Sequence, residues 1–341
     1  MIGSTPDQLA TLRALVEEGS FEAAAQRLHV TQPAVSQRVK QLERLVGQVL
    51  VRRTLPVSTT AAGDVVLRYA RQVQLLEAEA AAELGHGTAG GAGGAGGPAS
   101  TRPVPTSVAL AVNADSLGTW FLGALASLPS TVAAVFDLHR EDQEHTTSLL
   151  RSGTVLAAVT STREPVQGCS SEPLGLMRYR AVASPGFVER WLDGGGGGEG
   201  DGEGRLAAGG LATAPMIDFD RADDLQQRFL REELGHDPRP PRTFVPATAD
   251  FARAVELGLG WGMLPEQQCA DLLADGRLVD LAPGRAIDVA LWWQRWTLPS
   301  PLLDAVTDAV RATAARELRP VTRPAPPAVG PSRGGAASVG R

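Results

Sequence analysis

Amides, hydroxyls and cations crowd one short stretch of the chain, between residues 31 and 41. On a helix these side chains share one face, at Gln32, Ser36, Gln37, Arg38, Lys40 and Gln41. Such groups donate hydrogen bonds to base edges and bind phosphate oxygens. The face therefore predicts recognition of double-stranded DNA.

Carboxylates form a second set, farther along the chain. Glu141 and Asp142 follow one apolar run, and Asp218 and Asp220 bracket Phe219 at the end of another. Gathered at one cleft, they would suit a ligand with ammonium or guanidinium groups. The alternative is that each is a solvated loop acid.

A third candidate is the segment Asn113–Ser116, which precedes an apolar helical run. A helix N-terminus at a cleft offers free N–H groups to a carboxylate, and the Ser116 hydroxyl can add a bond. The alternative is that Asp115 or Ser116 only caps the helix.

Apolar residues at helical spacing predict the elements that must position the DNA-binding face. They are Ala24, Ala25 and Leu28 on a first helix, Val30 in a turn, and Val35, Val39 and Leu42 on a second helix. Thr31 can cap the second helix, and Pro33 lies in its first turn, where a missing N–H costs nothing. The stretch predicts a helix-turn-helix rather than an ordinary helical hairpin with a polar outer face.

This stretch resembles the signature of the LysR-type transcriptional regulators. The signature reads Ala-Ala, two variable residues, Leu, one variable residue, Val, Thr or Ser, Gln, Pro, Ala, Val or Leu, and Ser, and residues 24–36 here read AAQRLHVTQPAVS. The resemblance implies DNA contacts from Thr31, Gln32, Pro33, Ser36, Gln37, Arg38 and Lys40.

The flanking segments predict support for this motif. Pro6–Glu18 has the apolar spacing of a helix, and Val49–Val51 after Gly47 predicts a short hairpin or wing. Arg52 and Arg53 on the wing would hold the DNA backbone, unless they form only a solvated basic turn. A long Ala-rich helix is predicted at Ala61–Leu84, and the resemblance implies that it pairs with a second subunit in a homodimer or homotetramer.

The net charge of −6 is unevenly spread along the chain. Between Ala24 and Thr60 six cations stand against one anion, Glu43, so the remainder is acidic. Phosphate neutralisation is local, so a small basic footprint can bind DNA.

With 341 residues and 43% hydrophobic content, the chain suits a globular protein of two or three domains. Without an apolar run near the ~20 residues of a membrane span, and without a secretory signal at its start, it is expected in the cytoplasm. Cys169 and Cys269 are far apart in the sequence, and we expect both to be small buried apolar side chains. No cofactor or metal is expected.

Composition divides the chain into segments. We expect a winged helix-turn-helix domain at 1–60, a dimerisation linker helix at 61–84, a flexible Gly-rich linker at 85–106, an effector-binding domain at 107–319 with a mobile insertion at 193–204, and a disordered tail at 320–341. The predicted fold class is α+β multidomain, with an effector domain of two α/β subdomains like those of periplasmic binding proteins.

Strands alternate with helices in the predicted effector domain, which indicates mostly parallel sheets and a ligand site beyond the carboxyl ends of the strands. The predicted strands are Val108–Val112, Val132–Leu138, Leu156–Thr160, Tyr179–Ala183, Met216–Phe219, Gly262–Leu264 and Val289–Gln294. The predicted helices are Ser116–Leu125, Thr146–Leu150, Leu225–Glu233, Phe251–Leu257 and Leu302–Arg316.

At residues 113–122, NADSLGTWFL, the chain resembles the ArgP/LysG subfamily of LysR-type regulators, with further matches at Glu141-Asp142, Phe219-Asp220, Asp223-Asp224 and Met263–Pro265. That subfamily responds to lysine and arginine and includes activators of a basic-amino-acid exporter. The resemblance implies a regulator that binds lysine or arginine between two subdomains and changes its contact with DNA or its recruitment of RNA polymerase. The implied effector-binding residues are Asn113, Asp115, Ser116, Trp120, Glu141, Asp142, Thr160, Asp218, Asp220 and Thr248.

Other interpretations stay open. The chain could be a LysR-type regulator with a different small-molecule effector, or a solute-binding protein of similar fold. An enzyme is not expected, because the five histidines are scattered and no nucleophile elbow, zinc-binding helix or nucleotide loop is present.

Overall fold

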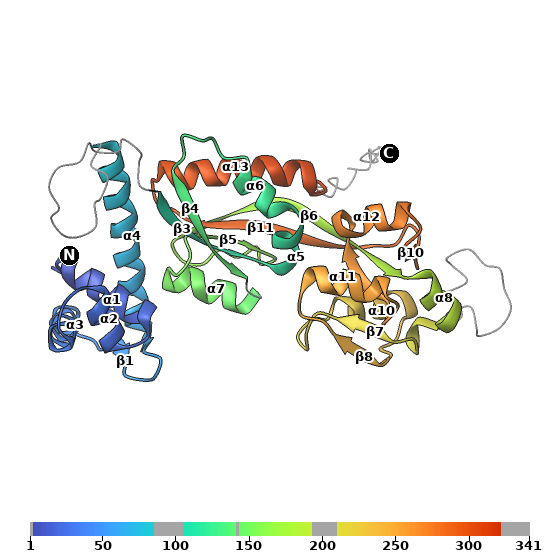
Figure 1. Ribbon diagram of the computed structural model, residues 1–341, viewed down its shortest axis with the longest axis horizontal. Coiled ribbons are helices and arrows are strands. Elements are labelled where there is room, and N and C mark those ends of the chain that lie inside the picture. The colour runs from blue at the N-terminus through green and yellow to red at the C-terminus, as the bar shows by residue number, and fades with distance from the viewer. Residues whose placement is uncertain (1–2, 85–104, 141–142, 193–209, 322–341) are drawn as a thin grey trace, which may run out of the picture.

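The computed structural model describes residues 3–84, 105–140, 143–192 and 210–321. A small N-terminal unit lies at one end of an elongated molecule, a long helix leads away from it, and a larger mixed unit forms the rest (Figure 1). Most of the predicted Gly-rich linker and tail, the whole predicted insertion, and Glu141 and Asp142 lie outside the described residues.

Three helices form the N-terminal unit, namely α1 (Pro6–Glu18), α2 (Phe21–Arg27) and α3 (Gln32–Val46). Each begins after a hydroxyl residue, Thr5, Ser20 or Thr31, whose side chain accepts a backbone N–H of the first turn. α1 and α3 both end at a glycine with a left-handed backbone, Gly19 and Gly47. The predicted helix-turn-helix is confirmed.

One apolar core holds these helices together. Leu12, Leu15, Val35, Val39 and Leu42 are all at most 1% exposed. The short strands β1 (Val51–Arg52) and β2 (Ser58–Thr59) pair antiparallel beside them and form the predicted wing.

Helix α4 (Ala61–Glu83) belongs to two cores. Val66, Leu67 and Ala70 pack into the N-terminal core, whereas Leu75 packs into the core of the C-terminal unit. The helix is therefore a structural bridge between the two units.

A seven-stranded sheet organises the C-terminal unit, in the order β10-β6-β11-β5-β3-β4 with β9 also paired to β6. The strands are β3 (Thr106–Val112), β4 (Ala134–Arg140), β5 (Ala157–Thr160), β6 (Cys169–Ala183), β9 (Gly262–Pro265), β10 (Val279–Asp280) and β11 (Ile287–Trp296). A separate parallel pair consists of β7 (Met216–Asp218) and β8 (Arg242–Phe244).

The prediction of mostly parallel sheets is wrong. In the seven-stranded sheet only β3–β4 and β3–β5 are parallel. The long strands β6 and β11 run antiparallel to each other, and β6 also pairs antiparallel with β9 and β10. Because β6 and β11 extend through both halves of the unit, they join two α/β halves into one continuous sheet (Figure 1).

Helices flank this sheet and fill the space around it. They are α5 (Ala114–Ser116), a π-helical turn (Leu117–Phe121), α6 (Leu122–Ala126), α7 (Gln143–Ser152), α8 (Pro185–Trp191), α10 (Leu225–Leu234), α11 (Thr248–Glu256), α12 (Glu266–Ala274) and α13 (Pro301–Glu317), with a 3₁₀ turn at Gly210–Ala212. In the half nearer α4, helices α6 and α13 cover one face of the sheet and α7 the other (Figure 1).

Two local predictions also need correction. Strand β6 begins at Cys169, before the predicted Tyr179, because residues 169–179 pair antiparallel with β11. Beside this pairing, the Arg178 guanidinium donates to both carboxylate oxygens of Asp288 at 2.7 Å. Cys269 is buried as predicted, but Cys169 is only half-buried.

Candidate nucleic-acid interface and ligand cleft

Helix α3 lies at the outer edge of the N-terminal unit (Figure 1), and its polar side chains face solvent. Gln32, Pro33, Gln37 and Lys40 are exposed and Ser36 is half-buried, while the apolar residues of the helix face the core. Thr31 caps the helix through a hydrogen bond from the Ala34 N–H at 3.4 Å. The polar face is therefore free to meet a partner in the single chain.

The cations near this face differ in what they contact. Lys40, the only lysine of the chain, and Arg52 have no ion-pair partner among the described residues. Arg53 lies over the Phe21 ring, 5.3 Å from its centroid. Arg38 is turned toward α1, where its guanidinium contacts Asp7 at 2.9 Å. In this conformation, Arg38 stabilises the packing of α1 on α3. Lys40 and Arg52 are available to bind phosphates.

A cavity of about 400 Å³ lies between the two halves of the C-terminal unit. Its walls come from the end of β3 and the start of α5, the end of β4, the loop after β7, the end of β9, and the first turns of α11 and α12. The lining residues are Asn113, Ala114, Asp115, Arg140, Phe219, Asp220, Ala222, Asp223, Leu225, Thr248, Phe251, Leu264, Pro265 and Gln268.

Asp115 joins the two halves across this cleft. Its carboxylate accepts a hydrogen bond from the Tyr179 hydroxyl at 2.7 Å and another from the Thr248 hydroxyl at 3.3 Å. Burial raises the pKa of Asp115, and these two hydrogen bonds only partly oppose the shift. Its hydrogen-bond partners among the described residues are neutral hydroxyls, so the carboxylate has the chemistry to receive a cation.

Two further carboxylates shape the loop after β7. Asp220 accepts the N–H groups of Ala222 and Asp223 at 2.7 and 3.0 Å. Asp223 accepts those of Phe219 and Leu225, both at 3.0 Å. Together with Asp115, they give the cleft wall three carboxylates against one guanidinium, that of the exposed Arg140. The lining residues of the described chain therefore favour a ligand with net positive charge.

Unpartnered polar atoms point to the same region. The side-chain oxygens of Asn113 and Gln268 are buried and have no hydrogen-bond donor in the described part of the chain, although both residues line the cavity. The Gln268 amide nitrogen donates to the Thr248 carbonyl at 2.9 Å, which leaves its oxygen as the acceptor without a donor. A buried acceptor without a donor raises the free energy of the folded chain, so these oxygens favour a ligand that donates N–H groups to them.

Four predicted effector-binding residues do not line the cavity. Ser116 and Trp120 are buried in the core under α5, where the Trp120 ring packs edge-on against Phe121. Thr160 is buried at the end of β5 and accepts the Thr162 N–H at 3.1 Å. Asp218 is 1% exposed and forms an ion pair with Arg242 at 3.0 Å that ties β7 to β8. These four side chains are buried, and none of them belongs to the lining of the cavity.

The sequence prediction omitted several lining residues as well as Tyr179. Arg140 directly precedes the predicted pair Glu141-Asp142, and Phe219 stands between two predicted acids. Their neighbours in the sequence could therefore have indicated that both line the cleft. Tyr179 and Gln268 carried none, because they reach the cleft from the middle of β6 and from α12.

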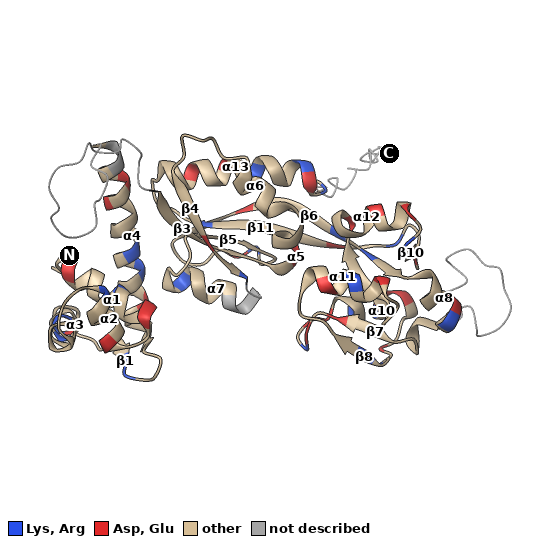
Figure 2. Cartoon of the chain, in the orientation of Figure 1, with Lys and Arg blue, Asp and Glu red and all other residues tan. Residues whose placement is uncertain are grey.

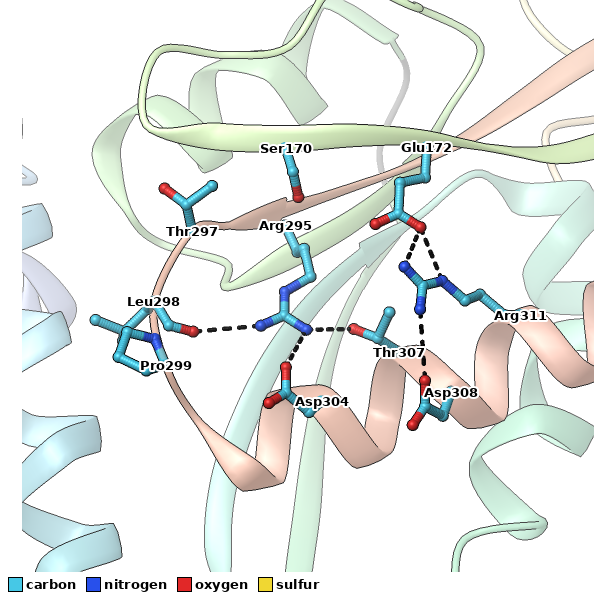
Figure 3. Close-up of a pocket in the computed structure, with 10 residues that line it drawn as sticks. All are labelled: Ser170, Glu172, Arg295, Thr297, Leu298, Pro299, Asp304, Thr307, Asp308 and Arg311. Atoms are coloured by element: carbon cyan, nitrogen blue, oxygen red, sulfur yellow. Dashed lines mark hydrogen bonds and ion pairs between the residues drawn. The ribbon is translucent and has the colours of Figure 1, made fainter.

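A second and larger cavity, of about 630 Å³, lies between α13 and the adjoining ends of β6 and β11 (Figure 3). Its charged groups satisfy one another. Arg295 contacts Asp304 at 2.6 Å, and Arg311 contacts Glu172 at 2.8 Å and Asp308 at 3.5 Å. The smaller cleft, in which no described cation forms an ion pair with Asp115, is the better candidate for ligand binding despite its size.

Comparison with known proteins agrees with this division. The family described as "Bacterial regulatory helix-turn-helix protein, lysR family" matches residues 6–64, and the "LysR substrate binding domain" matches residues 133–315. A curated relative, the lysine export transcriptional regulatory protein LysG of Corynebacterium glutamicum, is 40% identical over 316 residues, 92% of this chain and 99% of the relative.

Two solved structures are similar over almost the whole length. ArgP from Mycobacterium tuberculosis has 44% identity and a TM-score of 0.77, and the match covers 93% of this chain and 99% of that one. Full-length LysG from Corynebacterium glutamicum with bound effector Arg has 39% identity and a TM-score of 0.70, with 93% and 100% covered. The predicted fold class is confirmed.

The buried Asp218 predicts a pH-dependent contribution to stability. Burial raises its pKa to about 6 in the folded chain, against the attraction of Arg242, from an ordinary value of 3.8. The folded chain therefore holds this proton more tightly, and the contribution of Asp218 to the free energy of unfolding falls as the pH rises from about 4 to about 6. In chemical denaturation series, the stability of the parent relative to Asp218→Asn should rise as the pH falls from 7 to 4. A difference that is constant with pH would contradict the assignment.

Proposed function

Because the chain belongs to the LysR family of DNA-binding transcription regulators, we propose that it senses a basic amino acid, arginine or lysine, and controls transcription of an amino-acid exporter or a related gene. The observation that carries the effector proposal is the buried Asp115 carboxylate, whose hydrogen-bond donors among the described residues are two hydroxyls, in a cleft with an excess of acids. The arginine bound to the similar LysG structure supports the same class of ligand.

The charges of the cleft suggest how such a ligand is held. Asp115 receives the guanidinium or an ammonium group, and the buried oxygens of Asn113 and Gln268 accept its remaining N–H groups. Arg140, the one cation that lines the described cleft, is suited to the α-carboxylate. Asp220 and Asp223 make the electrostatic potential of the cleft more negative while they keep their hydrogen bonds to backbone N–H groups of the loop.

Calorimetric titration of the full chain tests this effector proposal. L-arginine or L-lysine should bind, and Asp115→Asn should weaken the affinity at least tenfold, because one charge-assisted contact is typically worth about 1.5–3 kcal/mol. Asp250→Asn, which removes an exposed acid of α11 outside the cavity lining, is the matched control. If the parent binds neither amino acid, the effector is not arginine or lysine. If Asp115→Asn binds as tightly as the parent, Asp115 does not contact the ligand.

We propose that α3 enters the major groove, with Gln32, Ser36 and Gln37 facing base edges and Thr31 and Pro33 at the helix start beside the backbone. Lys40, Arg52 and Arg53 bind phosphates. Arg38 joins them only by leaving Asp7, its partner at 2.9 Å in the free chain.

Lys40 gives the sharpest test of this interface. Lys40→Ala should lower the affinity for a DNA fragment from the intergenic region upstream of the chain's own gene. The slope of the logarithm of the association constant against the logarithm of the salt concentration should flatten by about 1 for each phosphate that Lys40 contacts. Arg190→Ala removes a cation from α8, distant from α3, and should leave the slope unchanged (Figure 2). Equal slopes for the parent and Lys40→Ala would show that Lys40 meets no phosphate.

We propose that α4 pairs with the α4 of a second subunit. Val65, Tyr69 and Leu76 share one stripe of the helix and are 53%, 40% and 40% exposed, which is unusual for apolar residues beside a core. A dimer places two copies of α3 on one duplex, and dimers of this kind can associate into tetramers.

Leu76→Glu tests the pairing, since it places a charge on this exposed apolar stripe. Equilibrium sedimentation should give the parent at a multiple of 35.7 kDa and the variant with at least tenfold weaker self-association. Gln74→Glu, an exposed position on another side of α4, is the control. A monomeric parent, or a variant that associates as strongly as the parent, would contradict the proposal.

Because its proposed target is chromosomal DNA, we infer that the chain acts in the cytoplasm, and we assign it no enzymatic reaction. None of the helices in the described part of the chain combines the length and apolar content that a bilayer span requires.

A further inference from the structure

One stripe of α4 is fastened to the C-terminal unit. Its residues Arg68, Arg71, Leu75 and Glu79 follow each other at helical spacing of three and four. This stripe is distinct from the exposed apolar one and from the residues that pack into the N-terminal core. The contact therefore leaves α4 free to pair with another subunit.

Arg71 touches three parts of the molecule. Its guanidinium donates to the Ser152 carbonyl at 3.3 Å and to the Thr154 hydroxyl at 3.0 Å, both at the corner between α7 and β5. The same group lies 3.9 Å from Glu17 of α1. Its side chain is only 13% exposed, so these contacts are shielded from solvent.

Glu79 makes the second attachment, at the start of α13. Its carboxylate accepts hydrogen bonds from the Ser300 hydroxyl and, at 3.3 Å, from the Leu302 N–H. An acid beside the N-terminus of a 17-residue helix is stabilised by free N–H groups and by the helix dipole. Between the two attachments Leu75, 5% exposed, packs into the core of the C-terminal unit.

Gly153 allows the close approach of α4 to the α7–β5 corner. Its backbone has φ of +72°, and a Cβ there would lie 2.8 Å from the Arg68 Cα and 2.6 Å from the Trp296 ring. Any larger residue would push α4 away, so the contact is built into the sequence at this corner.

Helix α7 connects this contact to the ligand cleft. Arg140 at the end of β4 lines the cleft, α7 begins at Gln143, and the helix ends at Ser152, whose carbonyl binds Arg71. Ten helical residues span about 15 Å as a stiff element. Because the Ser152 carbonyl at the far end of α7 accepts the hydrogen bond from Arg71, a shift of α7 reaches the linker helix directly.

We propose that Arg71 and Glu79 form an interdomain clamp on α4, and that α7 passes a change at the ligand cleft through this clamp to the DNA-binding unit. The clamp itself follows from the contacts of α4. The transmission step rests on the proposed function, because it needs a ligand in the cleft.

Hydrogen exchange tests the clamp without any ligand. In the full chain, the double variant Arg71→Gln/Glu79→Ala should exchange the amides of residues 71–83 at least tenfold faster than the parent, with α12 unchanged. Gln74→Ala/Glu77→Ala alters two exposed positions of the same helix and should behave as the parent. Equal protection of α4 in the parent and the clamp variant would overturn the clamp.

Coupling between ligand and DNA tests the transmission step. The coupling is measured as the dissociation constant of the upstream DNA fragment without L-arginine, divided by the constant with saturating L-arginine. In the clamp variant this ratio should lie within twofold of 1. Thr154→Val, which removes one acceptor of Arg71 at nearly constant volume, should reduce the ratio by less. Calorimetry should show unchanged arginine binding in both variants.

The outcomes separate the two hypotheses. A parent that binds no arginine contradicts the effector proposal, while the exchange experiment still decides the clamp. A clamp variant with faster exchange in α4 but the full parental coupling ratio would overturn transmission through Arg71 and Glu79.

Discussion

A buried carboxylate between two half-domains is the constraint on which the ligand site depends. Asp115 lies on α5, just after β3, Tyr179 reaches it from β6, and Thr248 reaches it from the start of α11. A charge that is taken out of water must be compensated, and two hydroxyls do this only in part. The cleft is therefore arranged for a positively charged group.

The DNA-binding unit obeys a different electrostatic rule. The chain carries a net charge of −6, yet the exposed face of α3 holds an unpaired lysine and the wing holds two arginines. Many arginines of the C-terminal unit are paired with acids, as Arg178 and Arg180 are with Asp288 and Glu266. Free cations near α3 thus give the acidic protein a local surface that phosphates can neutralise.

Local rules explain why the N-terminal unit could be predicted closely and the cleft could not. Caps at Thr31 and Gly47 and the spacing of Val35, Val39 and Leu42 act within a few residues, so the sequence displays them. The contact of Tyr179 with Asp115 spans 64 positions and depends on how β6 runs through the sheet. The direction of the strands was mispredicted for the same reason, because the partners of β6 and β11 are fixed by tertiary packing.

The most direct measurement is a crystal structure of the full chain grown with L-arginine or L-lysine. The account predicts a ligand nitrogen within hydrogen-bonding distance of the Asp115 carboxylate, with the ligand carboxylate near Arg140. A ligand whose nitrogens all lie away from Asp115, or one bound in the groove beside α13, would contradict it.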